Sequence, residues 1–214
     1  MESSPFSINH RLMIGIIDYG MGNLGSVTNA CAFLKLPSRI VTRPDEIGAC
    51  RAIILPGVGA FGDCVDHLVK HGFVEPVQAW IREGNPFLGI CLGLQMLYEG
   101  SEESPGVSGL GILPGQVRRF NLSKDWKIPQ IGWNNVRQAK KDCPLFKGIP
   151  DDSYFYFVHS YYVETDKNVT AGLTSYGMDY ASAIWKDNVV AVQFHPEKSQ
   201  KVGLQMLRNF GEWI

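Results

Sequence analysis

A cysteine between two closely spaced glycines is the residue of this chain best suited to attack a carbonyl carbon. Cys91 lies in the segment Gly89–Gly93, which has the form Gly-x-nucleophile-x-Gly. The segment follows an apolar run typical of a buried strand and precedes a helical pattern at 92–99. At such an elbow the nucleophile takes strained backbone angles, and the flanking glycines remove Cβ clashes. The N-terminus of the following helix favours the thiolate, which is the attacking species. A buried structural cysteine is the alternative interpretation.

A histidine and a glutamate two residues apart could act as the base and its orienting acid. His195 and Glu197 flank Pro196 at the end of the strand-like run 189–194. Histidine accepts a thiol proton near neutral pH and can return it to a leaving amine. A carboxylate that accepts a hydrogen bond from the ring orients the imidazole. His159 competes for the role of base, and sequence spacing alone does not choose between the two.

The elements that must position these side chains alternate in the first half of the chain. Strands are expected at 12–18, 39–42, 51–55 and 86–90, and helices at 26–35, 62–71, 74–83 and 92–99. This alternation predicts an α/β fold with a mostly parallel central sheet flanked by helices on both faces.

The second half has strand-like runs with few helical patterns between them. These runs lie at 116–120, 133–137, 153–157, 161–165, 181–185 and 189–194, and a helix is expected at 200–213. An additional antiparallel or mixed portion of the sheet is therefore predicted. We expect residues 12–214 to form a single domain and residues 1–11 to form an N-terminal extension, whose order the sequence leaves open.

Composition and charge narrow the class of protein. The formal net charge is −1, which gives no reason to expect a nucleic-acid partner. The five cysteines include no CxxC pair, which argues against a disulfide framework and fits a reducing compartment. The chain shows no signal-peptide pattern and no stretch of about 18 apolar residues, so a cytoplasmic protein without a membrane span is expected.

Two further motifs suggest different chemistry. Gly20–Gly25 fits Gly-x-Gly-x-x-Gly between a strand and a helix, the context of a dinucleotide-binding turn. A Rossmann-type NAD(P) enzyme is therefore an alternative, although Arg43 stands near the position where an acidic residue is expected. Cys64, His67 and His71 share one helical face, but a fourth ligand is missing and no metal site is predicted.

Several segments together resemble the class I, triad-type glutamine amidotransferases. Within that family they resemble the glutaminase subunits of imidazole glycerol phosphate synthase, the HisH type. The similarity runs from about residue 13 to the C-terminus. It is carried by the elbow with Gln95 and by the segments Asp18–Asn23, Pro56–Gly59, Pro129–Asn134, Tyr156–Tyr161 and Gln193–Ser199.

The resemblance implies a flavodoxin-like fold and the hydrolysis of L-glutamine to glutamate and ammonia without a cofactor. Cys91 would attack the carboxamide carbon. His195 would protonate the departing ammonia and then activate water, while Glu197 orients it. The oxyanion hole would be formed by the backbone N–H groups of Val58 and Leu92.

The resemblance also implies contacts with the substrate and with a partner. Substrate-binding residues would be Gly59, Gln95, Glu103, Ser160 and Tyr161. The partner would be a (β/α)8-barrel cyclase of the HisF type, bound as a heterodimer. It would receive the ammonia and make imidazole glycerol phosphate and aminoimidazole carboxamide ribotide in histidine biosynthesis. The residues facing it would be Asn23, Trp133, Tyr156 and Lys198.

Other assignments stay open at this point. Gly25 stands where many histidine-pathway members carry a basic residue, so a paralogous amidotransferase that supplies ammonia for surface-sugar modification is an alternative. A different triad hydrolase could use the same fold. The presence of Cys91, His195 and Glu197 together argues against a non-catalytic interaction subunit.

Overall fold

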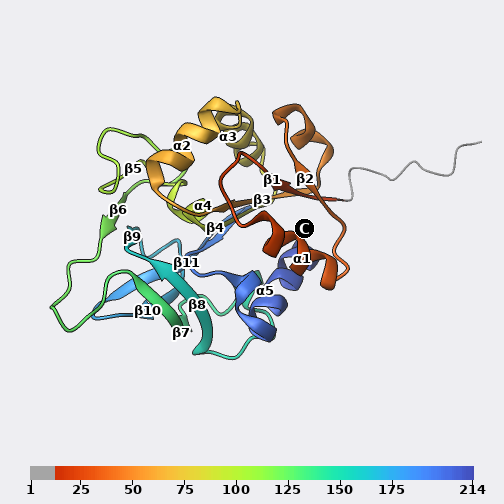
Figure 1. The fold of residues 1–214 in the computed structure, drawn as a ribbon. Helices are drawn as coiled ribbons and strands as arrows, with labels where there is room; N and C mark the ends of the chain where they lie inside the picture. The colour runs from red at the N-terminus through yellow and green to blue at the C-terminus, as the bar shows by residue number, and fades with distance from the viewer. Residues whose placement is uncertain (1–12) are drawn as a thin grey trace, which may run out of the picture.

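The computed structural model describes residues 13–214, which form a central sheet with helices on both sides (Figure 1). The expected N-terminal extension, 1–11, lies outside the described residues. The main path of the sheet has the order β2-β1-β3-β4-β12-β11-β10-β7-β8, and β5, β6 and β9 attach to it through β11.

The first part of the sheet is parallel. Its strands, in spatial order, are β2 (Ser38–Val41), β1 (Ile14–Ile17), β3 (Ala52–Gly57), β4 (Phe87–Cys91) and β12 (Val189–Val192). All but β2 are buried along their whole length, as expected for strands covered on both faces. The mostly parallel α/β sheet predicted from the sequence is thus confirmed.

Helices cover the two faces of the parallel part in pairs. One pair is α2 (Phe61–Lys70) and α3 (Val74–Arg82), and the other is α1 (Leu24–Phe33) and α5 (Gln200–Trp213) (Figure 1). Neighbouring strand residues point to opposite faces. Leu55 therefore joins the apolar cluster under α2 and α3, while Ile54 joins the cluster under α1 and α5.

The second part of the sheet is antiparallel, as predicted for the second half of the chain. Its main strands are β11 (Asp179–Lys186), β10 (Thr170–Ser175), β7 (Gln130–Gln138) and β8 (Ser153–His159). A side branch contains β9 (Tyr161–Glu164), β6 (Gln116–Arg119) and the short β5 (Gly100–Ser101).

The helix after the elbow is shorter than predicted. The sequence indicated a helix at 92–99, but α4 spans only Leu92–Gln95. Backbone groups beyond this turn bond to a returning segment instead. The N–H of Leu110 donates to Met96 O at 2.7 Å, and the N–H of Ile112 donates to Leu97 O at 2.9 Å. A long-range pairing therefore ends the helix, and no local breaker is involved.

Two strand predictions also need correction. The third strand was expected to stop before Pro56, but β3 continues through Pro56 and Gly57 beside β4. The strand β10 was not predicted, because its sequence lacks an apolar alternation. Its Gly172 lies between Val136 of β7 and Ala183 of β11, so close that an added Cβ would be 2.8 Å from the valine.

Over the described residues, three short 3₁₀ helices complete the fold, at Pro44–Ala49, Pro144–Phe146 and Pro196–Lys198. Each begins with a proline, whose fixed φ suits the first position of a helix. Within residues 13–214, every helix is too short or too polar to cross a membrane.

Candidate active site

The elbow places Cys91 at the end of β4 in an unusual backbone conformation. Its φ of 56° and ψ of −108° belong to a region that residues with a side chain rarely occupy. The glycines on each side are required by close packing. A Cβ on Gly89 would lie 2.5 Å from Gly93 O, and a Cβ on Gly93 would overlap Leu55 O. Only this glycine spacing lets the chain turn so tightly from strand into helix.

The topology brings His195 next to the elbow. β4 and β12 are adjacent parallel strands, with Ile90 paired with Val192, so both chains leave the sheet at the same edge. Cys91 and His195 line one cavity of about 290 Å³. Two side chains separated by about a hundred positions in the sequence thus meet at one site.

Glu197 holds the imidazole through a short hydrogen bond. His195 Nδ1 lies 2.8 Å from Glu197 Oε1, and the two side chains are only 2% and 1% exposed. The ring nitrogen donates and the carboxylate accepts, which leaves Nε2 for chemistry. Among residues 13–214, Nε2 has no hydrogen-bond partner. The 3₁₀ turn that starts at Pro196 sets the distance between the ring and the carboxylate.

The electrostatic environment favours a charged imidazole. Burial alone lowers the pKa of His195, but attraction to Cys91 and Glu197 outweighs burial and raises the pKa to about 10. A protonated ring beside the cysteine at neutral pH can give a proton to a leaving group. Such an arrangement suits acyl transfer with a thiolate nucleophile.

The competing histidine has a different environment. His159 Nδ1 lies 2.8 Å from Tyr161 O, and Nε2 lies 3.1 Å from the Tyr180 hydroxyl. Because a carbonyl oxygen can only accept, Nδ1 must carry the hydrogen. Burial lowers the pKa of His159 to about 4. Both nitrogens are occupied and the ring is neutral, so the geometry favours a structural role for His159 and leaves His195 as the candidate base.

The neutral, buried state of His159 predicts acid sensitivity. The pKa of this ring is about 4 in the folded chain against an ordinary 6.5, so the unfolded chain binds more protons between these values. Its contribution to folding stability is therefore complete above pH 6.5 and falls by about 3 kcal/mol as the pH drops through 4. Urea unfolding of the wild type and of His159→Gln across this window measures the effect. If both proteins lose stability equally as the pH falls, the assignment is wrong.

The remaining residues expected at the substrate line the same cavity. Its walls are formed by Val58, Gly59, Cys91, Leu92, Gln95, Glu103, Pro129, Val158, His159, Ser160, Tyr161 and His195. Gln95 is buried, and its Oε1 has no partner among the described residues. One oxygen of Glu103 accepts a hydrogen bond from the N–H of Phe61 at the start of α2, at 2.8 Å. The cavity thus offers polar groups on several sides.

The two backbone groups expected to form an oxyanion hole also lie at the cavity. Leu92 is the first residue of α4, where a backbone N–H has no acceptor within the helix. Val58 follows the end of β3, and its carbonyl accepts a hydrogen bond from Cys64 Sγ at 3.5 Å. Gly57 packs closely against the elbow. A Cβ added at position 57 would lie only 2.7 Å from Leu92 Cβ, so this position has room only for glycine.

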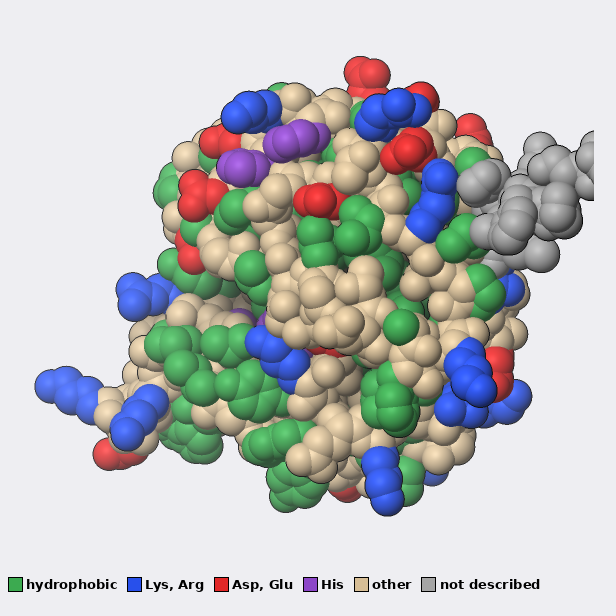
Figure 2. All heavy atoms as spheres, turned by 45° about the vertical axis from the view of Figure 1, so that its right-hand side comes forward, with side chains coloured by type: hydrophobic (Ala, Val, Ile, Leu, Met, Phe, Trp, Pro, Cys, Tyr) green, Lys and Arg blue, Asp and Glu red, His purple; other side chains and the backbone are tan. Residues whose placement is uncertain are grey.

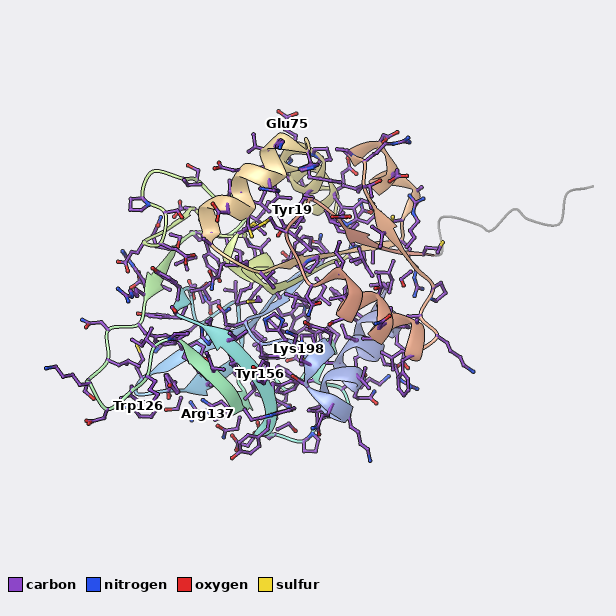
Figure 3. The ribbon with its side chains drawn as sticks, viewed as in Figure 1. Tyr19, Glu75, Trp126, Arg137, Tyr156 and Lys198 are labelled. Atoms are coloured by element: carbon purple, nitrogen blue, oxygen red, sulfur yellow. The ribbon has the colours of Figure 1, made fainter. Side chains whose placement is uncertain are left out.

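The residues expected to face a partner lie outside the cavity. Trp133 of β7 pairs with Tyr156 of β8, and their rings stand edge to face at 6.1 Å. Tyr156 and Lys198 lie close together in Figure 3, and the Tyr156 N–H donates to Ser199 Oγ, next to Lys198, at 2.9 Å. Asn23 precedes α1 at the glycine-rich turn.

The glycine-rich turn and the three candidate metal ligands have contacts within the protein. Gly20 has a φ of 85° and packs against His67, whose Nδ1 lies 3.1 Å from Tyr19 O. His71 Nδ1 lies 2.8 Å from His67 O, and Cys64 Sγ donates to the backbone carbonyl of Val58 at 3.5 Å. In the part of the chain that the structure describes, no group of three or more His, Cys, Asp or Glu side chains is placed to hold a metal.

Sequence reasoning did not single out Gln193. This side chain is completely buried and its Nε2 lies 3.7 Å from Cys91 Sγ. The available signal was a glutamine directly after the apolar run of β12, since a buried amide needs specific hydrogen-bond partners.

Comparison with known proteins agrees with this geometry. The family model described as "Glutamine amidotransferase class-I" matches residues 16–212. The chain is 49% identical over 203 residues to a protein of Desulfitobacterium hafniense named "Imidazole glycerol phosphate synthase subunit HisH", covering 94% of this chain and 95% of that protein. A protein of the same name from Methanocaldococcus jannaschii is 48% identical over 204 residues, covering 94% and 100%.

A solved structure described as "Crystal structure of glutamine amidotransferase" has the same fold. Its TM-score is 0.73 at 18% identity, with 93% of this chain and 97% of that chain covered. The family model and the relatives extend over almost the whole chain, so their agreement does not rest on one motif. The chain therefore belongs to the class I glutamine amidotransferase family, in the branch of the HisH subunits.

Proposed function

We propose that this chain is a glutaminase subunit that hydrolyses L-glutamine to glutamate and ammonia. The observation that carries the proposal is the meeting of Cys91 and His195 at one cavity, with Glu197 hydrogen-bonded to the His195 ring. Each of the three has the chemistry that such a reaction needs, and they come from adjacent strand ends and a fixed turn.

The proposed reaction proceeds through a thioester on Cys91. The thiolate attacks the side-chain carboxamide carbon, and the resulting oxyanion is stabilised by the N–H groups of Val58 and Leu92. His195 gives its proton to the departing ammonia. The neutral ring then takes a proton from water, whose oxygen attacks the thioester and releases glutamate. Glu197 keeps the ring oriented throughout.

The proposed substrate position uses the polar walls of the cavity. Gln95 Oε1 is a buried acceptor without a partner among residues 13–214, so it can accept a hydrogen bond from an amide or ammonium group of glutamine. The Glu103 carboxylate supplies negative charge for the α-amino group. Gly59, Ser160 and Tyr161 also line the cavity, and we propose that they surround the α-amino and α-carboxylate groups of the bound glutamine.

An exposed apolar surface beside the cavity supports a protein partner. We call this surface, formed by Ile131, Trp133, Tyr154, Tyr156 and Val158, the β7–β8 face. Figure 2 shows hydrophobic side chains gathered over this end of the molecule. Ile131 is 63% exposed and Trp133 is 46% exposed, and neighbouring exposed apolar side chains of this kind are typical of a protein–protein interface. Val158 belongs to both the face and the cavity wall.

This continuity suits the transfer of ammonia. A partner that covers the β7–β8 face would receive ammonia where it leaves the cavity, before it reaches solvent. The HisH relatives are named as subunits of imidazole glycerol phosphate synthase, so we propose a (β/α)8-barrel cyclase of the HisF type as the partner. The proposed product of the pair is imidazole glycerol phosphate, in histidine biosynthesis.

An acidic residue on the β7–β8 face should uncouple the two proteins. Ile131→Asp is expected to weaken binding of a HisF-type cyclase by at least about tenfold. In the proposed complex a charged carboxylate would replace an apolar side chain that the partner covers. We expect the cyclase to stimulate glutamate formation from glutamine by the wild-type chain. In Ile131→Asp this stimulation should be lost at low cyclase concentrations and regained at high ones, as assays with and without the cyclase would measure.

The matched control is Ile40→Asp, since Ile40 is 46% exposed on β2 at the other end of the sheet. It should bind the cyclase as the wild type does. Wild-type chain that forms no glutamate from glutamine, alone or with the cyclase, would contradict the proposed function itself.

A further inference from the structure

A chain of buried amide hydrogen bonds runs beneath the nucleophile. Gln193 Nε2 donates towards Cys91 Sγ at 3.7 Å, and Gln193 Oε1 accepts a hydrogen bond from Gln95 Nε2 at 3.0 Å. Gln95 Nε2 also donates to the backbone carbonyl of Tyr161 at 3.2 Å. Both glutamine side chains are almost completely buried. The chain therefore connects the sulfur to a fixed point of the backbone.

The carbonyl at the end of this chain fixes the direction of every bond in it. Tyr161 O can only accept, so the atom of Gln95 that faces it must be the nitrogen. The same nitrogen then faces Gln193, so the facing atom of Gln193 must be the oxygen. Gln193 is left with its nitrogen towards Cys91. The sulfur consequently faces an N–H donor, and turning either amide would break two hydrogen bonds.

The backbone of Gln193 is equally fixed. Its N–H donates to Ser182 O at 2.9 Å, directly after β12. The neighbouring His195 follows two residues later, so one strand end supplies both the base and a donor to the sulfur. Two amides would be costly to bury merely as packing, since apolar side chains of similar volume fill a core without needing partners.

We propose that Gln193 is a positioning residue that donates a hydrogen bond to the Cys91 thiolate and holds the Gln95 amide in its substrate-binding orientation. This inference rests on the proposed glutaminase function. The donor stabilises negative charge on the sulfur, which lies at the cavity. The same bond leaves Gln95 Oε1, and not its nitrogen, as the free group of the amide at the cavity.

The direct test is the rate at which Cys91 reacts with iodoacetamide. Gln193→Met keeps the length of the side chain but removes the donor. Alkylation of Cys91 at neutral pH should fall about tenfold, the usual effect of losing one hydrogen bond to a charged acceptor. Gln193→Glu should reduce it further, because its carboxylate repels the thiolate. At strongly alkaline pH the rates of wild type and variants should converge, since every thiol is then deprotonated.

Gln138→Glu is the matched control, because Gln138 is a half-buried glutamine on β7 that donates to Ile149 O at 2.8 Å, away from the cavity. Its Cys91 should react like that of the wild type. Peptide mass spectrometry distinguishes Cys91 from the four other cysteines, all of them buried.

The possible outcomes separate the inference from the proposed function. Unchanged alkylation of Cys91 in Gln193→Met would overturn the inference. An alkylation rate lowered equally at all pH values would also overturn the inference. That result would indicate that iodoacetamide reaches Cys91 less easily, and not that the sulfur has lost a hydrogen-bond donor. If Cys91 of the wild type reacts no faster at neutral pH than the other cysteines, the nucleophile assignment fails and the inference fails with it.

Discussion

Cys91→Ala should lower the rate of glutamine hydrolysis by at least about a thousandfold, because the covalent intermediate is proposed to form on the sulfur that this change removes. Its fold should stay intact. Alanine keeps the Cβ, and the glycines at 89 and 93 still permit the tight turn. Glutamate release, followed with and without a HisF-type cyclase, measures the loss.

Two controls make this result specific to the sulfur at position 91. Cys31→Ala removes another buried thiol, from the cluster under α1 and α5, and should keep full activity. In complex with the cyclase, Cys91→Ala should still support synthesis from added ammonia. Retained glutamine-dependent activity in Cys91→Ala would show that another group is the nucleophile.

Glu197→Gln should have the second largest effect. The amide has the size of the carboxylate but no charge, so His195 loses both a strong acceptor and the attraction that raises its pKa. We expect the turnover rate to fall about a thousandfold, as expected for a triad whose orienting acid is neutralised. The pKa of His195 should also fall, so that the alkaline limb of the pH–rate profile moves to lower pH.

Glu164→Gln provides the comparison for this variant. Glu164 forms an ion pair with Arg118 at 3.0 Å, but that pair is exposed and contributes little. Its turnover should match that of the wild type at every pH. A Glu197→Gln enzyme with normal turnover, or with an unshifted alkaline limb, would contradict the assignment of Glu197 as the orienting acid.

The local features of this fold could be predicted from the sequence, and the long-range features could not. The buried strands, the four long helices and the elbow follow from apolar periodicity and glycine spacing. The strand β10 was missed because it contains Gly172, a residue that is uncommon in strands. Glycine is needed there because side chains of β7 and β11 leave no room for a Cβ. The length of α4 was overestimated because a returning segment at 110–112 binds the carbonyls of Met96 and Leu97, just past the end of the helix.

The same distinction applies to the candidate site. Cys91, His195 and Glu197 were apparent because each lies at a strand end with a characteristic neighbour. The family resemblance implied His195 as the base, but residue spacing alone did not choose between His195 and His159. The structural argument against His159 needed the contacts of Tyr161 and Tyr180, which come from other strands. The role of Gln193 depends on two amides nearly a hundred positions apart, which no local pattern reveals.

The backbone angles of Cys91 carry a consequence for the evolution of this chain. A side chain held at φ 56° costs about 1–3 kcal/mol, and glycine would relieve that strain. The thermodynamically preferred residue at the most important position is thus one that cannot catalyse anything. Selection for folding stability alone would replace Cys91 with glycine and abolish the activity. Only selection for the activity keeps a thiol at the elbow.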